Sequence, residues 1–144
     1  MNHIQSFAAL AGRILLAAMF VTSGWDKIAG YAGTQQYMES AGVPGILLPL
    51  VILAELGGGL AVAFGFHARI AALALAGFTV LAALLFHADF SNGMQAVMFS
   101  KNISIAGGFL LLAAFGPGAW SVDGWRAGRT GAAGFGAKSA AGRA

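Results

Sequence analysis

Long apolar blocks, and not short alternating patterns, dominate the chain. Four of them approach the roughly 20 residues that an α-helix needs to cross the hydrocarbon core of a bilayer. They cover about residues 6–24, 44–66, 69–87 and 102–120. This pattern predicts an all-α fold, an integral membrane bundle of four transmembrane helices.

Turn residues and polar segments separate these blocks. Residues 25–27 (WDK) end the first block, residues 65–69 (GFHAR) form a turn between the second and third, and residues 116–118 (GPG) stop the fourth. Between the first two spans, residues 31–42 (YAGTQQYMESAG) mix polar side chains with aromatic residues and a methionine. This composition predicts a short helix that lies at the membrane interface.

The end of the chain has a different composition. Residues 126–144 are mostly Ala, Gly and basic residues without periodicity. They predict a disordered basic tail behind a four-helix transmembrane domain of residues 1–125.

Basic residues beside the predicted spans gather on the side of both termini. They are Arg69, Arg126, Arg129, Lys138 and Arg143. The opposite side has Lys27 and Lys101. Because cytoplasmic segments of membrane proteins carry the excess of Lys and Arg, both termini are predicted to be cytoplasmic.

Overall composition supports the membrane class and narrows the chemistry. Of the 144 residues, 58% are hydrophobic and 9% are charged, against roughly 25% charged in soluble domains. The absence of cysteine excludes disulfides and thiolate ligation of a metal. The three histidines fall at different levels of the predicted bundle, so no intrinsic metal site is expected. The net charge of +3 comes largely from basic residues on the predicted cytoplasmic side, where they orient the protein in the membrane. No nucleic-acid partner is therefore expected.

Two charged residues fall inside predicted spans. Arg13 lies about two turns into the first span, and Glu55 lies near the middle of the second, which runs in the opposite direction. An unpaired charge at the bilayer centre costs on the order of 3 kcal/mol, so we predict that the two side chains pair inside the bundle. Two interpretations stay open: a site for a substrate, a quinone or a proton, or a structural clasp that fixes helix register.

Glycines on the predicted spans favour close helix packing, because small residues let helices approach one another in lipid. Those beside the charged positions or on the fourth span are Gly24, Gly58, Gly59 and Gly108.

A second polar group collects at the predicted outer ends of the helices. Its members are Trp25, Asp26, Lys27, His87, Lys101 and Asn102. They form either a rim that binds a ligand or partner, or solvated helix ends with lysines that extend to the interface.

Several short motifs occur in a fixed order between about Leu10 and Trp125. They are RILLAAMFVTSGWDKI (13–28), GVP (42–44), AELGGGLAVAFGFHAR (54–69), FH (86–87), KNISIAGGFLLL (101–112) and GPGAWSVD (116–123). In this order and spacing the chain resembles the small bacterial proteins of the DoxX family. The resemblance implies a four-helix, multi-pass protein of the bacterial inner membrane, with Arg13 and Glu55 at recurrent polar positions.

The resemblance also implies a redox setting without naming a reaction. Some relatives belong to systems that oxidise thiosulfate with quinone as acceptor, and others assemble with oxidative-stress enzymes. Three hypotheses follow: an accessory membrane subunit that binds a redox or envelope-homeostasis partner; an oxidoreductase component that binds quinone through Arg13 and Glu55; and a homo-oligomeric carrier of a small molecule or proton. Whether the chain is an enzyme on its own stays open.

Overall fold

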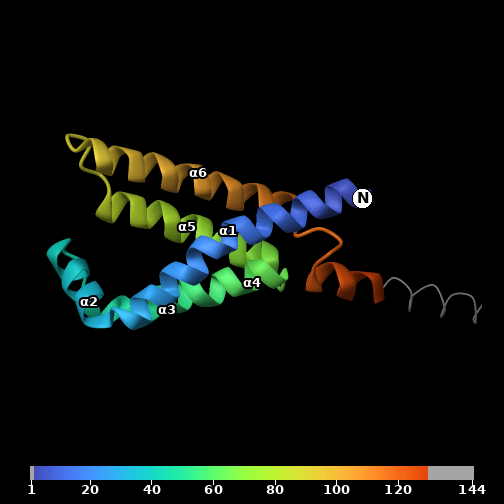
Figure 1. Cartoon of the computed structure of the whole chain (residues 1–144), viewed down its shortest axis with the longest axis horizontal. Helices are drawn as coiled ribbons and strands as arrows, with labels where there is room; N and C mark the ends of the chain where they lie inside the picture. The colour runs from blue at the N-terminus through green and yellow to red at the C-terminus, as the bar shows by residue number, and fades with distance from the viewer. Residues whose placement is uncertain (1, 130–144) are drawn as a thin grey trace, which may run out of the picture.

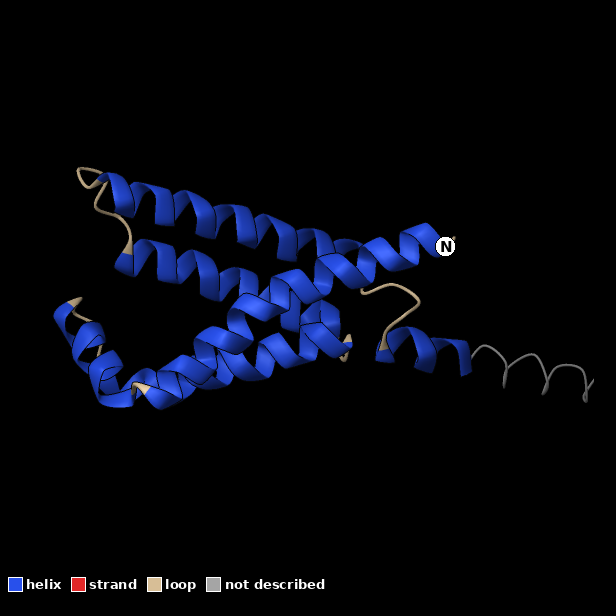
Figure 2. Cartoon of the chain, viewed as in Figure 1, coloured by secondary structure: helices blue, strands red, loops and turns tan. Residues whose placement is uncertain are grey.

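A computed structural model describes residues 2–129, and this part of the chain is built of helices (Figures 1 and 2). In chain order they are α1 (His3–Ala29), α2 (Tyr31–Ser40), the 3₁₀-helix η1 (Gly45–Leu47), α3 (Leu48–Ile52), the π-helix η2 (Leu53–Gly57), α4 (Gly58–Phe64), α5 (Ala68–Phe86) and α6 (Gly93–Phe115). Four continuous segments are long and apolar enough to cross a membrane: His3–Ala29, Gly45–Phe64, Ala68–Phe86 and Gly93–Phe115. The predicted all-α fold with four transmembrane helices is confirmed.

The helices pack as two antiparallel pairs. One pair is α1 with the segment from α3 to α4, and the other is α5 with α6. The pairs cross toward the end of α5 and α6 that lies nearer the N-terminus, and they diverge toward the end where α2 lies (Figure 1). At the crossing, Phe20 of α1 meets Phe109 of α6 edge to face, with 5.2 Å between ring centroids. The buried core therefore lies at the crossing, and a wedge opens on the side of α2.

Large apolar side chains cover the outside of the bundle. Leu15, Leu50, Ile70 and Leu111 are each more than 60% exposed. Such a surface is unfavourable in water and is what a lipid-facing surface requires. The outer surface of the four helices is therefore hydrophobic, as expected for helices that contact lipid.

Glycines bring α1 against the second span. A Cβ on Gly24 would lie 3.0 Å from the backbone nitrogen of Leu56, and a Cβ on Gly59 would lie 3.0 Å from Cγ2 of Val21. Gly58 and Gly108 similarly lie close to leucine side chains of α5 and α1. These contacts fix which residues of the antiparallel helices are level with one another.

The first and last spans differ from the predicted bounds. Helix α1 continues to Ala29, so residues 25–27 lie inside the helix instead of ending it. The sequence predicts the fourth span at 102–120, but α6 runs from Gly93, where the Asn92 side chain caps its first turn, to Phe115. Gly116, at φ 84°, ends this helix. The helix tolerates isolated polar residues between 93 and 101, and for that reason hydropathy alone places the span too late.

The segment after α6 folds back on the bundle and then forms a short helix over residues 122–129. The prediction of a disordered tail from residue 126 is wrong for residues 126–129, and residues 130–144 lie outside the described part. Both ends of the described chain are at the same end of the bundle (Figure 1). The cytoplasmic location of the termini stays a prediction based on the basic residues.

Candidate functional site

Arg13 and Glu55 are both buried, but they lie in different layers of the bundle. Gly24 faces Leu56 across the antiparallel pair, which puts Glu55 level with the last turns of α1. The guanidinium of Arg13 instead lies against Gly65, ten residues beyond Glu55, or about 15 Å farther along the helix axis. The prediction that the two side chains pair is therefore wrong. In a helix the side chain points toward the N-terminus, which directs Arg13 away from Glu55.

Arg13 instead holds backbone segments together at the end of the bundle near both termini. Its Nε donates to the carbonyl oxygen of Ala63 at 3.2 Å, Nη1 to that of Pro117 at 2.6 Å and Nη2 to that of Trp120 at 2.9 Å. The last carbonyls of a helix lack intrahelical partners, and the loop after α6 has no regular hydrogen bonds of its own. Arg13 satisfies these acceptors, so its role here is structural.

Asp123 completes this structural cluster, although the sequence alone gives no reason to single it out. Its carboxylate accepts hydrogen bonds from the backbone N–H of His67 at 3.0 Å and of Ala68 at 2.8 Å, at the start of α5. Its own N–H donates to the carbonyl oxygen of Gly65. Arg69 donates to the last carbonyls of α6, those of Ala113 and Ala114. Asp123 thus caps the start of α5, and Arg69 caps the end of α6. Together they join the turn after α4 to the loop after α6.

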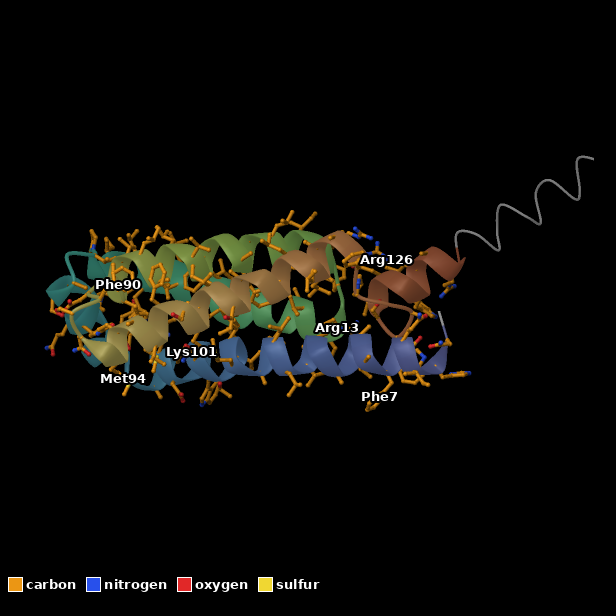
Figure 3. All side chains as sticks on the ribbon, turned by 90° about the horizontal axis from the view of Figure 1, so that it is seen from above. Phe7, Arg13, Phe90, Met94, Lys101 and Arg126 are labelled. Atoms are coloured by element: carbon orange, nitrogen blue, oxygen red, sulfur yellow. The ribbon has the colours of Figure 1, made fainter. Side chains whose placement is uncertain are left out.

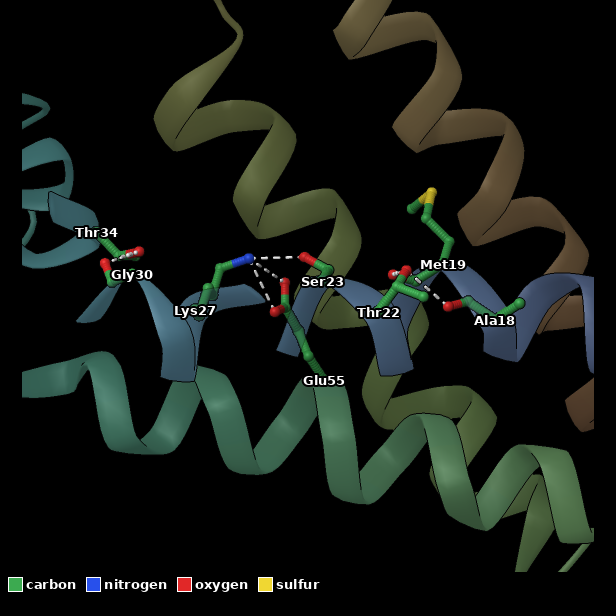
Figure 4. A network of polar contacts seen from close by, with 8 residues as sticks. All are labelled: Ala18, Met19, Thr22, Ser23, Lys27, Gly30, Thr34 and Glu55. Atoms are coloured by element: carbon green, nitrogen blue, oxygen red, sulfur yellow. Dashed lines mark hydrogen bonds and ion pairs between the residues drawn. The ribbon is translucent and has the colours of Figure 1, made fainter. Parts of the chain in front are cut away.

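The partner of Glu55 is Lys27, near the opposite end of the bundle. Lys27 Nζ lies 2.9 Å from Oε2 of Glu55 and donates to Oε1 at 3.1 Å. It also donates to Oγ of Ser23, one turn earlier on α1, at 2.7 Å (Figure 4). Glu55 belongs to the π-helical turn η2, and single π-turns inside α-helices occur frequently at functional sites.

A cavity of about 370 Å³ adjoins this ion pair, in the wedge between the two helix pairs. Helix α2 closes one side, with Met38 buried and the ring of Tyr37 stacked on that of Phe86 at 5.5 Å. The other polar groups that line the cavity are Ser23, Thr34, Thr79, His87 and Asn102. Most of the other residues that line the cavity are apolar or aromatic. The ion pair therefore lies at one side of a largely apolar cavity.

The predicted outer rim is only partly brought together. Lys27, His87 and Asn102 line the cavity, whereas Trp25, Asp26 and Lys101 do not. The signal in the sequence that could have found this site is the Ser23–Lys27 spacing of four residues. It places both side chains on one face of α1 if the helix continues past residue 24.

The loop at this end carries its own hydrogen bonds. His87 Nδ1 lies 2.6 Å from Oε1 of Gln95, which ties the end of α5 to the first turn of α6. In the loop between them, hydrogen bonds from the hydroxyl and then the backbone N–H of Ser91 hold the pKa of Asp89 below its usual value. Within residues 2–129, no three His, Asp or Glu side chains are grouped to hold a metal ion.

An apolar layer separates the two polar ends. It contains Ala17 and Phe20 of α1, Val62 of α4, Leu75 of α5 and Phe109 of α6, all of them buried. Figure 3 shows Arg13 and Arg126 toward one end of the bundle and Lys101, Met94 and Phe90 toward the other. The structure thus has a capped end held by Arg13 and Asp123, and a cavity end with the Lys27–Glu55 pair.

Comparison with known proteins gives a consistent assignment. Residues 8–88, which include Arg13, Lys27, Glu55 and His87, match the model of the DoxX family. The chain is 58% identical to "Inner membrane protein YqjF" of Escherichia coli (strain K12) over 123 residues, which cover 85% of this chain and 95% of that protein. It is 37% identical to "Inner membrane protein YphA" of the same organism over 121 residues, 79% of this chain and 86% of that protein. No solved structure gives a significant match.

Proposed function

The chain belongs to the DoxX family and is an inner-membrane protein, and on this basis we propose that it binds a small amphipathic molecule in the cavity beside Lys27 and Glu55. The observation that carries the proposal is an ion pair in the wall of a cavity, about ten residues into the second span. Ionisable side chains inside membrane spans usually mark sites of ligands or protons.

Stability alone is a weak reason for this pair. Removing two charges from water often costs more free energy than their mutual attraction provides. A well-packed apolar pair in the same place is therefore often at least as stable as the ion pair. The far end of the bundle is already joined by Arg13. A charged pair retained at the diverging end, beside open volume, supports a binding role.

The cavity has the size and composition of a ligand site. Small-molecule sites are mostly apolar, hold a few polar groups and start at about 300 Å³. Leu47, Leu81 and Leu85 line this cavity and are also 41%, 54% and 46% exposed. We therefore place the apolar tail of the molecule at these leucines, on the side of η1 and α5, with its polar head directed to Lys27 and Glu55.

A quinone is the cofactor that this composition favours. Its ring suits the aromatic wall formed by Phe20, Phe78 and Phe86, and its tail suits the leucine-lined opening. When bound, a quinone supplies reversible two-electron chemistry. The chain would hold and orient its carbonyl oxygens through donors that line the cavity, the ammonium of Lys27 and the hydroxyl groups of Ser23 and Tyr37, while Glu55 holds the ammonium in place. Arg13, expected from the sequence to take part, lies at the other end of the bundle and is not part of this proposal.

A partner-binding role, with a redox protein or a second copy as partner, is supported by a different observation. Helix α6 has the lowest mean hydropathy of the four spans, 1.5, and is also the least buried. Lys101 lies eight residues, or about 12 Å, into this helix with its side chain exposed. Within residues 2–129, the side chain of Lys101 makes no hydrogen bond or ion pair. A carboxylate on a neighbouring membrane helix would compensate this charge.

The proposed ligand is tested by purification from native membranes in mild detergent, followed by mass spectrometry of bound small molecules. Ala82 lines the cavity, and Ala74, on the same helix, is exposed on the outside. We expect Ala82→Phe to remove the bound species by filling the cavity and Ala74→Phe to retain it. Equal retention in both variants would show that the cavity is not the binding site.

A further inference from the structure

We infer that the molecule bound in the cavity carries oxygen atoms on two opposite sides of its ring, and that Asn102 of α6 binds the second of them, across the cavity from Lys27. The inference rests on the proposed function, because it concerns the same cavity. Its basis is an amide group that has no partner within the protein and the position of this amide relative to Lys27.

The side chain of Asn102 is buried without a hydrogen-bond partner. It is 9% exposed, and within residues 2–129 its amide makes no hydrogen bond. Asn102 lies nine residues, or about 14 Å, into the membrane-spanning helix α6. Buried polar groups in proteins are nearly always paired, because an unpaired one costs free energy. The amide therefore calls for a partner that the described part of the chain does not supply.

A molecule in the cavity can reach this amide. Asn102 lines the cavity. The fully enclosed side-chain nitrogen and oxygen atoms that lack a partner within residues 2–129 do not include those of Asn102, so its amide keeps accessible surface. Thr79 lines the same cavity from the neighbouring helix α5, but its hydroxyl donates to the carbonyl oxygen of Leu75 at 2.6 Å and not to Asn102.

Lys27 and Asn102 face each other across the wedge. At its narrow end, Phe20 of α1 contacts Phe109 of α6, with 5.2 Å between ring centroids. Lys27 follows Phe20 by seven residues, and Asn102 precedes Phe109 by seven, so each lies about 10.5 Å from this contact toward the cavity end. Residues seven apart share a helix face. The two side chains therefore lie at one level on opposite walls of the cavity, which both of them line.

The wall on α1 supplies a hydrogen-bond donor of its own. Oγ of Ser23 accepts a hydrogen bond from Lys27 at 2.7 Å, and within residues 2–129 the hydroxyl of Ser23 donates to no other group. Its proton is thus left for a molecule in the cavity, and the neighbouring positive charge strengthens it as a donor. The cavity therefore has one polar wall at Ser23 and Lys27 and another at Asn102.

A ring with an oxygen on each of two opposite sides fits these two walls. Phe20, Phe78 and Phe86 also line the cavity and suit a flat ring. A molecule with a single polar group at Ser23 would leave the amide of Asn102 unpaired. A para-quinone or its hydroquinone pairs with both walls. The amide serves either form, because it can donate to a carbonyl oxygen and can accept from a hydroxyl.

The test compares molecules with two and with one ring oxygen on the purified protein in lipid nanodiscs, by calorimetry without oxygen, with empty nanodiscs as the blank. The probes are butyl-substituted hydroquinone, its quinone, ortho-butylphenol and meta-butylphenol. Each phenol lacks one of the two hydroxyl groups of the hydroquinone. We expect the hydroquinone and the quinone to bind at least about fivefold more tightly than either phenol, the amount that one neutral hydrogen bond supplies.

Asn102→Leu assigns the second oxygen to its binding residue. We expect this variant to weaken the hydroquinone and the quinone by at least about fivefold and to change the affinity of one of the two phenols by less than about twofold, since that phenol has no group at Asn102. Ser104→Leu is the matched control, because Ser104 is an exposed polar residue of the same helix outside the cavity. It should leave all four affinities unchanged.

The outcomes separate this inference from the proposed function. If a phenol binds the unaltered protein as tightly as the hydroquinone and the quinone, and Ala82→Phe abolishes that binding, the second polar contact is overturned and the cavity remains a ligand site. If Asn102→Leu weakens all four probes equally, or none of them, the assignment to Asn102 is overturned. If no probe binds the unaltered protein, the inference and the proposed quinone site are both overturned. The comparison on the unaltered protein stands even if the Asn102 variant does not fold.

Discussion

Lys27 places its Nζ 2.9 Å from Oε2 of Glu55 and so joins the last turn of α1 to the π-helical turn inside the second span (Figure 4). The contact is made where the two helix pairs diverge and beside the cavity that they leave. The charges in this membrane protein are therefore compensated locally, in two separate layers, and not across the bundle between Arg13 and Glu55.

The ion pair should show strong coupling in a double-mutant cycle. Lys27→Met leaves the carboxylate of Glu55 buried without its counter-ion, and we expect a loss of about 3 to 5 kcal/mol in the free energy of unfolding. Adding Glu55→Leu should recover most of this loss. Denaturant unfolding in detergent, followed by tryptophan fluorescence, measures both. A double variant as unstable as Lys27→Met alone would show that the two side chains are not coupled.

Arg13 should matter for stability and not for ligand binding. Arg13→Leu removes three donors from the carbonyl oxygens of Ala63, Pro117 and Trp120, and each buried acceptor left unpaired costs about 1 to 3 kcal/mol. We expect Arg13→Leu to lower the unfolding temperature clearly. The fraction of the variant that remains folded should bind the ligand with unchanged affinity. The exposed Arg129, stacked on Trp125, provides the control, since Arg129→Leu should shift the unfolding temperature little. Loss of affinity in folded Arg13→Leu would contradict the division into two layers.

The approach of α1 to the second span should depend on Gly24. A Cβ there meets the backbone of Leu56 at 3.0 Å, and backbone cannot move aside as a side chain can. Gly24→Ala is therefore expected to destabilise the bundle by about 1 to 3 kcal/mol. Gly12 lies on the same helix, and a Cβ added to it would have nothing within 4 Å, so Gly12→Ala should be neutral or stabilise by up to about 1 kcal/mol. Unfolding in detergent measures both variants, and equal effects of the two substitutions would argue against this packing.

The exposed lysine of α6 should determine association with a membrane partner. If a carboxylate of a neighbouring helix compensates Lys101, then Lys101→Glu should abolish co-purification of that partner and Lys101→Arg should retain it. Quantitative mass spectrometry of chemically cross-linked native membranes gives the readout. Identical partner yields from the two variants would indicate that the lysine extends to the interface instead.

The sequence was sufficient for the fold because lipid imposes simple rules. Backbone groups must be satisfied inside each span, so long apolar blocks translate directly into helices. It was not sufficient for the pairing of charges. Arg13 is bonded to carbonyl oxygens, which every residue has and which no pattern distinguishes. Hydropathy assigns Lys27 to a helix end because the apolar block stops before residue 25, although the helix continues to Ala29.

The sequence indicated only part of the candidate site, because hydropathy identifies polar residues near helix ends but not those inside apolar runs. Lys27, His87 and Asn102 stand out in the sequence as polar residues near helix ends, and they do line the cavity. Thr79 is hidden inside an apolar run of α5, where its hydroxyl bonds to the preceding turn. The contribution of α2 depends on how its short helix folds over the wedge between the helix pairs, which hydropathy does not encode.

The central claim, that a lipid-soluble aromatic molecule binds between the helix pairs beside Lys27 and Glu55, is tested most directly by photoaffinity labelling in native membranes. A decyl hydroquinone with a photoreactive diazirine on the ring is irradiated, and the modified residues are identified by peptide mass spectrometry. The account predicts labels within residues 34–47 and 78–87, suppressed by excess unlabelled compound and by Ala82→Phe. Labels that excess compound does not suppress, or that gather near Arg13 and Trp120 at the capped end, would contradict it.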